Sequence, residues 1–143
     1  MYAALPVNEG ADIDPASLKD VPLFAGLSRG ARKIVAQHTD EVELAVGTKI
    51  VSEGALAYEL FVIVEGTAEV SEGGGTVIAQ MGPGDVVGEI GVLRTHRRTA
   101  TVTATTPVKA LVMYGPELTA LSETMPEVFT ELESLIEERL SPD

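Results

Sequence analysis

From residue 41 to residue 114 the chain is divided into many short apolar segments that are separated by turns containing glycine. Residues 42–46 alternate between apolar and polar or small side chains, which is the period-two pattern of a half-buried strand. Residues 60–64 are almost all apolar, as in a strand that is buried on both faces. Residues 71–75 are rich in glycine and predict a hairpin tip. The pattern predicts a mainly β fold, an antiparallel double-sheet, jelly-roll-like barrel.

Helical patterns flank this β region on both sides. Residues 1–13 show no period, so we expect a loosely held tail unless it docks on the domain. Residues 14–40 predict a helical entry, in which Ser28 can cap the second helix. Residues 115–140 predict two C-terminal helices, a short one from Gly115-Pro116-Glu117 to Leu121 and a longer one that starts at Pro126. The whole chain, residues 1–143, is therefore predicted to be one domain.

The composition limits the functions that such a fold can serve. The chain has 143 residues, of which 45% are hydrophobic, so it can bury a core. It has no cysteine, which excludes disulfides and cysteine nucleophiles and makes a cytoplasmic protein the default expectation. The formal charge of -12 argues against nucleic acid and anionic membranes as partners. No apolar run approaches the length of a membrane span.

One stretch departs from this acidic background. Three of the ten Lys and Arg residues, Arg94, Arg97 and Arg98, lie within five positions, shortly after the pair Gly88-Glu89. Backbone N–H groups at a turn near glycines can converge on an anion, and a guanidinium binds phosphate through two parallel hydrogen bonds. Glu89 would repel a phosphate, but it can accept a hydrogen bond from a neutral hydroxyl beside it. A pocket with both properties suits a nucleotide.

Residues 88–100 resemble the phosphate-binding cassette of cyclic nucleotide-binding domains, as found in the cAMP receptor protein and in protein kinase A regulatory subunits. The family pattern is Gly-Glu, an aliphatic, a small and another aliphatic residue, a loop, then Arg, a small or hydroxyl residue, and Ala. The positions that match this pattern are Gly88, Glu89, Ile90, Gly91, Val92, Arg98, Thr99 and Ala100. The resemblance extends from about Leu23 to Leu140. Many relatives have proline directly before the arginine, where this chain has Arg97.

The resemblance implies a role for each part of the cassette. Glu89 would accept a hydrogen bond from the ribose 2′-hydroxyl, and Arg98 would hold the cyclic phosphate. Backbone N–H groups near Gly91 and Val92 would support the phosphate, and the hydroxyl of Thr99 would reach the phosphate or the base. The implied ligand is cAMP, with cGMP also compatible with Thr99. We expect a regulatory module without a cofactor, which is either stand-alone or a fragment of a longer protein.

The surroundings of Arg98 can also be read without the family. Arg98 stands at the head of an alternating strand and shares its parity with Ala100, Val102 and Ala104, so its side chain is predicted to face inward. A buried guanidinium needs an anion, because an unpaired charge is costly to desolvate. A ligand phosphate and an internal ion pair are the two candidates for that anion.

The last predicted helix has an apolar stripe on one side and glutamates on the other. The stripe consists of Val128, Phe129, Leu132, Leu135, Ile136 and Leu140. Packing on the barrel is the simpler interpretation, because apolar stripes usually face a core. In the family the corresponding helices close over the bound base, which would make Leu135, Ile136 and Leu140 a lid. We expect the readout to be a partner protein that docks on this helix, or a homodimer formed through it.

Two alternatives to nucleotide binding stay open. The barrel could act as a ligand-independent protein-interaction domain, although the pair Glu89 and Arg98 argues against that. A cupin-like enzyme would need clustered histidines to bind a metal, and the two histidines, His38 and His96, fall in different predicted elements. No nucleophile paired with a base is visible, so we predict neither a catalytic residue nor a metal site.

Overall fold

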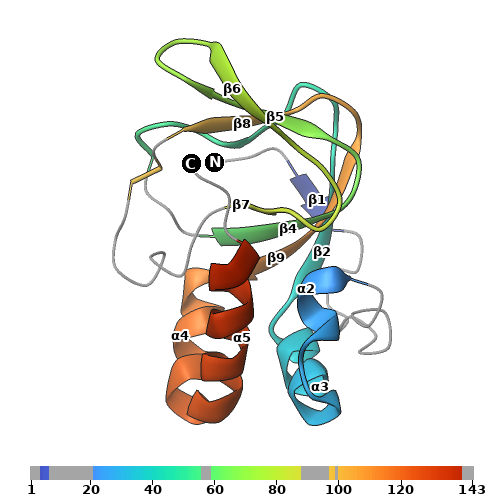
Figure 1. Ribbon diagram of the computed structural model, residues 1–143, viewed down its shortest axis with the longest axis vertical. Helices are drawn as coiled ribbons and strands as arrows, with labels where there is room; N and C mark the ends of the chain where they lie inside the picture. Colours follow the sequence, from blue (N-terminus) through green and yellow to red (C-terminus); the bar gives the residue numbers. More distant parts are fainter. Residues whose placement is uncertain (1–3, 7–20, 56–58, 88–96, 99, 140–143) are drawn as a thin grey trace.

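The computed structural model of the protein describes residues 4–6, 21–55, 59–87, 97–98 and 100–139. In this part of the chain the elements form three layers (Figure 1). Four helices make one outer layer of the described chain, a five-stranded sheet lies in the middle, and a four-stranded sheet makes the other outer layer. The middle sheet is therefore covered on both faces.

All strand pairs in both sheets are antiparallel. The middle sheet has the strand order β1 (Ala4–Pro6), β2 (Asp40–Leu44), β9 (Val108–Tyr114), β4 (Glu59–Glu65) and β7 (Val86–Val87). The second sheet has the order β3 (Lys49–Val51), β8 (Thr101–Ala104), β5 (Ala68–Glu72) and β6 (Thr76–Met81). The prediction of a mainly β, antiparallel double-sheet fold with flanking helices is confirmed.

The barrel part of that prediction is wrong. Among the described residues the two sheets share no strand, so the molecule is a sandwich and not a closed barrel. The edges of the middle sheet are short, because β1 has three residues and β7 has two. The sequence shows the period of each strand but not which edges meet.

Strand β4 shows how the middle sheet is packed on both faces. Phe61 and Ile63 are fully buried in the core between the two sheets. Leu60 and Val62 belong to a separate core beneath the helices. Successive side chains of a strand point to opposite faces, which is why one strand serves both cores. The apolar run at residues 60–64 is therefore the doubly buried strand that the sequence predicts.

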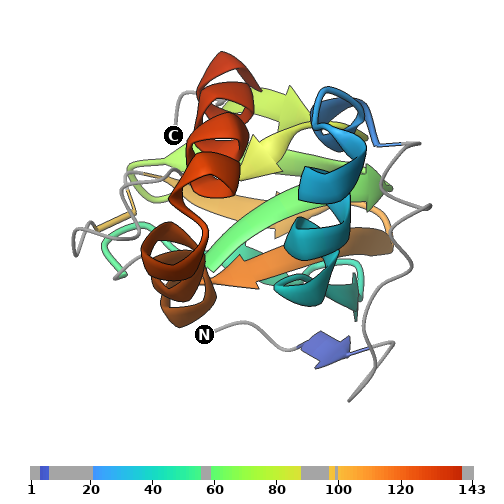
Figure 2. The same cartoon turned by 90° about the horizontal axis from the view of Figure 1, so that it is seen from below.

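The helical layer consists of α2 (Pro22–Ala25), α3 (Arg29–Gln37), α4 (Gly115–Thr124) and α5 (Pro126–Arg139). Figure 2 shows α3 and α5 over the same face of the middle sheet. Helix α3 begins as predicted, because the hydroxyl oxygen of Ser28 accepts a hydrogen bond from the N–H of Ala31 at 3.2 Å. The predicted starts of the last two helices are also confirmed, and α4 continues beyond Leu121 to Thr124.

Glycines occupy the turns that the sequence predicts at positions 47, 54, 66 and 84, and all four have positive φ. Gly66 lies between β4 and β5 with a φ of 96°. A Cβ atom at this position would stand 2.3 Å from the carbonyl oxygen of Pro107. Both the backbone conformation and the close approach of the neighbouring turn therefore require glycine there.

The N-terminal segment contains a strand that the sequence pattern does not reveal. Ala4–Pro6 pairs with β2 at the edge of the middle sheet, where proline is tolerated. Three residues are too few to show a period, so this docking could not be predicted. The helix predicted to start at Asp14 lies outside the described residues. No helix in the described part of the chain has the length and hydropathy to span a membrane.

Candidate ligand-binding site

Two of the predicted contact positions, Arg98 and Ala100, lie among the described residues. Both are buried, with 6% and 0% of their surface exposed. The inward orientation predicted for Arg98 is thus confirmed. The other predicted contacts, Gly88, Glu89, Ile90, Gly91, Val92 and Thr99, lie outside the described residues. Their roles, and a cavity shared by Glu89 and Arg98, stay predictions.

The backbone of Arg98 is fixed by the turn that follows β3. The N–H of Arg98 donates a hydrogen bond to the carbonyl oxygen of Ala55 at 2.7 Å, and its own carbonyl accepts one from Gly54 at 2.8 Å. Gly54 has a φ of 85°, a conformation that glycine adopts without strain. The turn therefore fixes the main chain from which the Arg98 side chain projects.

The guanidinium of Arg98 is held by Glu59, the first residue of β4. Nη2 of Arg98 donates a hydrogen bond to the backbone carbonyl oxygen of Glu59. The same nitrogen lies 3.9 Å from the carboxylate of Glu59. Only 4% of the Arg98 side chain and 19% of the Glu59 side chain are exposed. An internal ion pair, the second of the two anions considered for Arg98, is therefore present.

Burial raises the pKa of the Glu59 carboxyl, and the positive charge of Arg98 opposes this shift. Desolvation is the larger of these two effects, because only 19% of the Glu59 side chain is exposed. The carboxylate thus compensates the charge of Arg98 while its own ionised form is disfavoured. An anion that came close to Arg98 would compete with this carboxylate.

Arg97 is turned away from Arg98, as neighbouring residues of an extended chain are. Its side chain is exposed, and its guanidinium donates a hydrogen bond to the carbonyl oxygen of Gly54 at 2.8 Å. Its charge can still attract an anion from a distance. The arginine at the family's proline position thus adds a third hydrogen bond between this segment and the turn.

The described part of the α5 stripe packs against the helical layer. Val128 and Leu132 are buried in the core beneath the helices, and Leu135 packs against its edge. A Cβ atom at Gly26 would lie 2.9 Å from Cδ2 of Leu135, so α5 comes close to the end of α2. Packing, the simpler interpretation, is confirmed for these residues. The lid role of Leu135 stays a prediction, and the side chains of Ile136 and Leu140 lie outside the described part.

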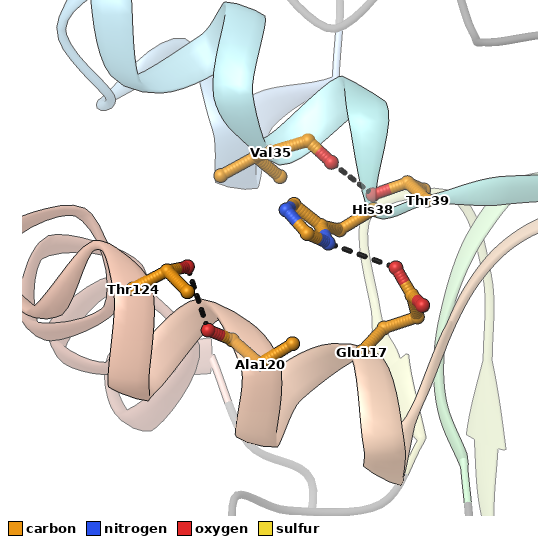
Figure 3. A network of polar contacts seen from close by, with 6 residues as sticks. All are labelled: Val35, His38, Thr39, Glu117, Ala120 and Thr124. Atoms are coloured by element: carbon orange, nitrogen blue, oxygen red, sulfur yellow. Dashed lines mark hydrogen bonds and ion pairs between the residues drawn. The ribbon is translucent and has the colours of Figure 1, made fainter.

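Two carboxylates attach the ends of α3 to the C-terminal helices. At its start, Oε1 of Glu131 in α5 accepts a hydrogen bond from the N–H of Ser28 at 2.7 Å. At its end, Nδ1 of His38 lies 2.8 Å from Oε1 of Glu117 in the first turn of α4 (Figure 3). The sequence suggests an ordinary helix-face role for His38 and a solvated face for Glu131. Neither contact can be predicted from a local sequence pattern, because Ser28 and Glu131 are 103 positions apart and His38 and Glu117 are 79 positions apart.

A surface depression of about 380 Å³ lies away from Arg98, at the ends of β2, β4 and β9. Its lining residues are Glu43, Leu44, Ala45, Glu65, Pro107, Val108 and Lys109. Lys109 is already 3.8 Å from Glu41 and 3.7 Å from Glu65. No set of three His, Asp or Glu side chains among the described residues is arranged to hold a metal ion. The depression therefore lacks the buried, charged centre that Arg98 provides.

Residues 41–125 match the family model of the cyclic nucleotide-binding domain. The matched segment begins in β2, includes Arg98, and ends just after α4, so it contains both sheets except β1. It spans more than half of the chain. The chain belongs to the cyclic nucleotide-binding domain family.

Within this family, the chain is similar to the cAMP-dependent protein kinase regulatory subunit of Mycosarcoma maydis, with 39% identity over 90 residues. That alignment covers 61% of this chain and 17% of the relative, so the chain spans less than a fifth of that protein's length. The regulatory subunits of Eremothecium gossypii, Yarrowia lipolytica and Schizosaccharomyces pombe are 34%, 31% and 28% identical to this chain. These alignments cover 67–76% of this chain and 21–32% of the relatives.

Solved structures show the same fold. The N-terminal domain of a transcriptional regulator from Streptomyces coelicolor is 30% identical, with a TM-score of 0.71, and the match covers 92% of this chain and all of that one. A cyclic nucleotide-binding domain from Methylobacillus flagellatus has a TM-score of 0.79 at 16% identity, covering 95% of this chain and 83% of that one. The second likeness supports the fold alone.

Proposed function

We propose that this domain binds a cyclic nucleotide, with cAMP as the first candidate and cGMP as the second, and that Arg98 holds the cyclic phosphate. The observation that carries the proposal is the buried guanidinium of Arg98, at the position where the family's cassette has its arginine. The relatives with 39% and 34% identity are named regulatory subunits of cAMP-dependent protein kinases, which favours the first candidate. The proposed role is regulatory and cytoplasmic.

The energetics of such a site are sufficient. Each hydrogen bond between charged groups contributes about 1.5–3 kcal/mol. A few such bonds to the phosphate, together with burial of the base, exceed the cost of association and give a dissociation constant of about 1 µM. Glu89 and Thr99 are the proposed further contacts, to the ribose and to the phosphate or base.

We further propose that binding is relayed to α5. A ligand shifts a conformational equilibrium only when it binds one form more tightly than the other. Helix α5 is attached to α3 through Glu131 and to the end of α2 through Leu135. A cassette that moves toward the phosphate could alter these contacts, and a partner protein or a second copy of the chain would then read the new position of α5.

A thermal shift panel tests nucleotide binding. We expect cAMP, and more weakly cGMP, to raise the melting temperature, while AMP and cyclic dinucleotides do not. A ligand at one hundred times its dissociation constant stabilises the folded protein by about 2.7 kcal/mol. Failure of every nucleotide to shift the melting temperature at millimolar concentration would contradict the proposal.

Arg98→Ala should abolish the shift, and Arg97→Ala is the matched control at the neighbouring position. Because Arg97 is exposed, its loss should weaken binding by only a few fold through the lost charge. Circular dichroism of both variants checks that the fold is kept. Equal binding by Arg98→Ala and the wild-type protein would exclude Arg98 as the phosphate contact.

A second candidate is a protein-interaction domain that needs no ligand. It is favoured by the pair of Arg98 and Glu59, since a charge satisfied within the protein does not require an external anion. The same panel separates the two candidates, because this alternative predicts no shift with any nucleotide.

A further inference from the structure

The ion pair of Arg98 and Glu59 joins the two sheets at one end of the sandwich. Glu59 begins β4 of the middle sheet, whereas Arg98 lies shortly before β8 of the second sheet. Among the ion pairs between described residues, this one has the most deeply buried cation, since the side chain of Lys109 is 33% exposed and that of His38 is 23% exposed. The contact is therefore part of the interior and not a surface pair.

The backbone and the side chain of Glu59 act differently on Arg98. The carbonyl oxygen of Glu59 accepts a hydrogen bond from Nη2, which orients the guanidinium. The carboxylate oxygen is 3.9 Å away, beyond the length of a hydrogen bond, so it acts on Arg98 through charge alone. The carboxylate can therefore lose its charge or its place while the guanidinium stays oriented by the backbone.

We propose that Glu59 is a positioning residue of the nucleotide site, whose carboxylate competes with the ligand's phosphate for Arg98, so that nucleotide binding is coupled to the uptake of a proton by Glu59. The inference rests on the proposed function. A phosphate bound to Arg98 places a second anion near a carboxylate that is largely withdrawn from water. The two anions repel each other, and the single positive charge of Arg98 cannot compensate both, so protonation of Glu59 removes the repulsion.

The direction of the pH dependence follows from the two states of Glu59. In the free protein burial raises its pKa, and Arg98 opposes the shift. A bound phosphate offsets the charge of Arg98 and therefore raises the pKa of Glu59 further. A group whose pKa is higher in the complex takes up a proton on binding, so affinity falls as the pH rises from the free to the bound pKa. Above and below this window the affinity is constant.

Few other described titratable groups face this carboxyl. Arg98 is its charged partner, and Tyr114 lies opposite Glu59 in the register of β4 and β9. His96, two positions before Arg98 in the sequence, has a second ionisable side chain and lies outside the described residues. The experiment must therefore separate the effect of Glu59 from that of His96.

The test compares cAMP affinity at pH 5 and pH 8 by isothermal titration calorimetry for the full chain and two variants. Glu59→Gln removes the charge but keeps the backbone carbonyl. Glu65→Gln is the matched control, because it makes the same change at the other end of β4 on an exposed side chain. A pKa difference of one unit between the two states corresponds to a factor of about ten.

We expect wild-type protein and Glu65→Gln to bind cAMP about tenfold more weakly at pH 8 than at pH 5. Glu59→Gln should bind about tenfold more tightly than wild type at pH 8 and lose most of this dependence. Should Glu59→Gln keep the wild-type slope, or bind more weakly at both pH values, the inference is overturned. A retained slope would assign the titration to another group, such as His96.

A second measurement needs no variant. Wild-type titrations in buffers of different ionisation enthalpy give the number of protons taken up per nucleotide, and we expect a positive value inside the pH window. A value of zero at every pH would overturn the inference even if Glu59→Gln did not fold. If neither cAMP nor cGMP binds, or if Arg98→Ala binds as well as wild type, the proposed function itself fails. Arg98-dependent binding without proton uptake rejects the role of Glu59 alone.

Discussion

The two interiors of the molecule are held together in different ways. The core between the sheets is enclosed by strands whose backbones are hydrogen-bonded in fixed register. The core beneath the helices has the middle sheet as one wall, but its other wall is attached by side chains. The two links at the ends of α3, made by Glu131 and Glu117, are single carboxylate contacts. The sandwich is therefore the rigid part, and the helical layer is the part that can move.

This difference bears on where a ligand signal can travel. Moving a strand breaks several backbone hydrogen bonds at once, whereas moving α5 exchanges side-chain contacts with solvent. The proposed phosphate contact, Arg98, lies at the end of the sandwich, and the proposed readout lies in the helical layer. The proposed relay would therefore change the side-chain contacts of α5 while the strands keep their register. Three substitutions probe it, in order of decreasing expected effect.

Phe61→Ala should have the largest effect. Phe61 is fully buried between the sheets, and truncation would remove its packing and leave a cavity. We expect a loss of about 3–5 kcal/mol in the free energy of unfolding, measured by urea denaturation. We also expect nucleotide binding to weaken, because Arg98 is bound to the first residue of β4 and the packing of this strand would loosen. A loss below 1 kcal/mol would show that this core is not the rigid part.

Leu132→Ala should rank second. Leu132 is fully buried in α5 beneath the helical layer, and the substitution should cost about 2–4 kcal/mol. Native-state hydrogen exchange should show the loss of protection chiefly in α4 and α5, with β4 and β9 changing less. Equal loss in helices and strands would mean that the two cores open as one unit.

Glu131→Ala should have the smallest of the three effects. It removes the acceptor for the N–H of Ser28 at the start of α3 and should cost about 1 kcal/mol. Glu127→Ala, at an exposed position in the first turn of α5, is the control and should cost less. The comparison uses midpoints of urea denaturation. If both variants lose the same stability, the link between α3 and α5 contributes nothing beyond the helix itself.

Much of the fold could be predicted because its signals are local. The period-two alternation, the apolar run that became β4 and the cap at Ser28 each depend on a few consecutive residues. The strand order could not be predicted, since it depends on pairings between distant segments. The strand at Ala4–Pro6 was missed because three residues carry no periodic signal, and the same lack of long-range information led to the expectation of a closed barrel.

The candidate site divides in the same manner. The inward orientation of Arg98 follows from its parity with Ala100, and the family pattern in the sequence is confirmed by the match to the family model. Its partner Glu59 could not be found from the sequence, because it lies 39 positions away at the head of a strand whose pattern indicates only burial. An internal ion pair is one of the two alternatives that the sequence leaves for Arg98, but only the fold identifies its acidic member.

The oxygen that orients Arg98 belongs to the main chain of residue 59, and that has a consequence for how this site can be tuned. Every amino acid supplies the same carbonyl, so position 59 can be varied while the aim of the guanidinium is left alone. Side chains at position 59 would then compete with the phosphate for Arg98 to different degrees. Glutamate would compete through its charge, glutamine only as a neutral polar group, and an apolar residue not at all. If the domain binds a nucleotide as proposed, a substitution at position 59 would set the detection threshold of a biosensor without changing the proposed contact residues.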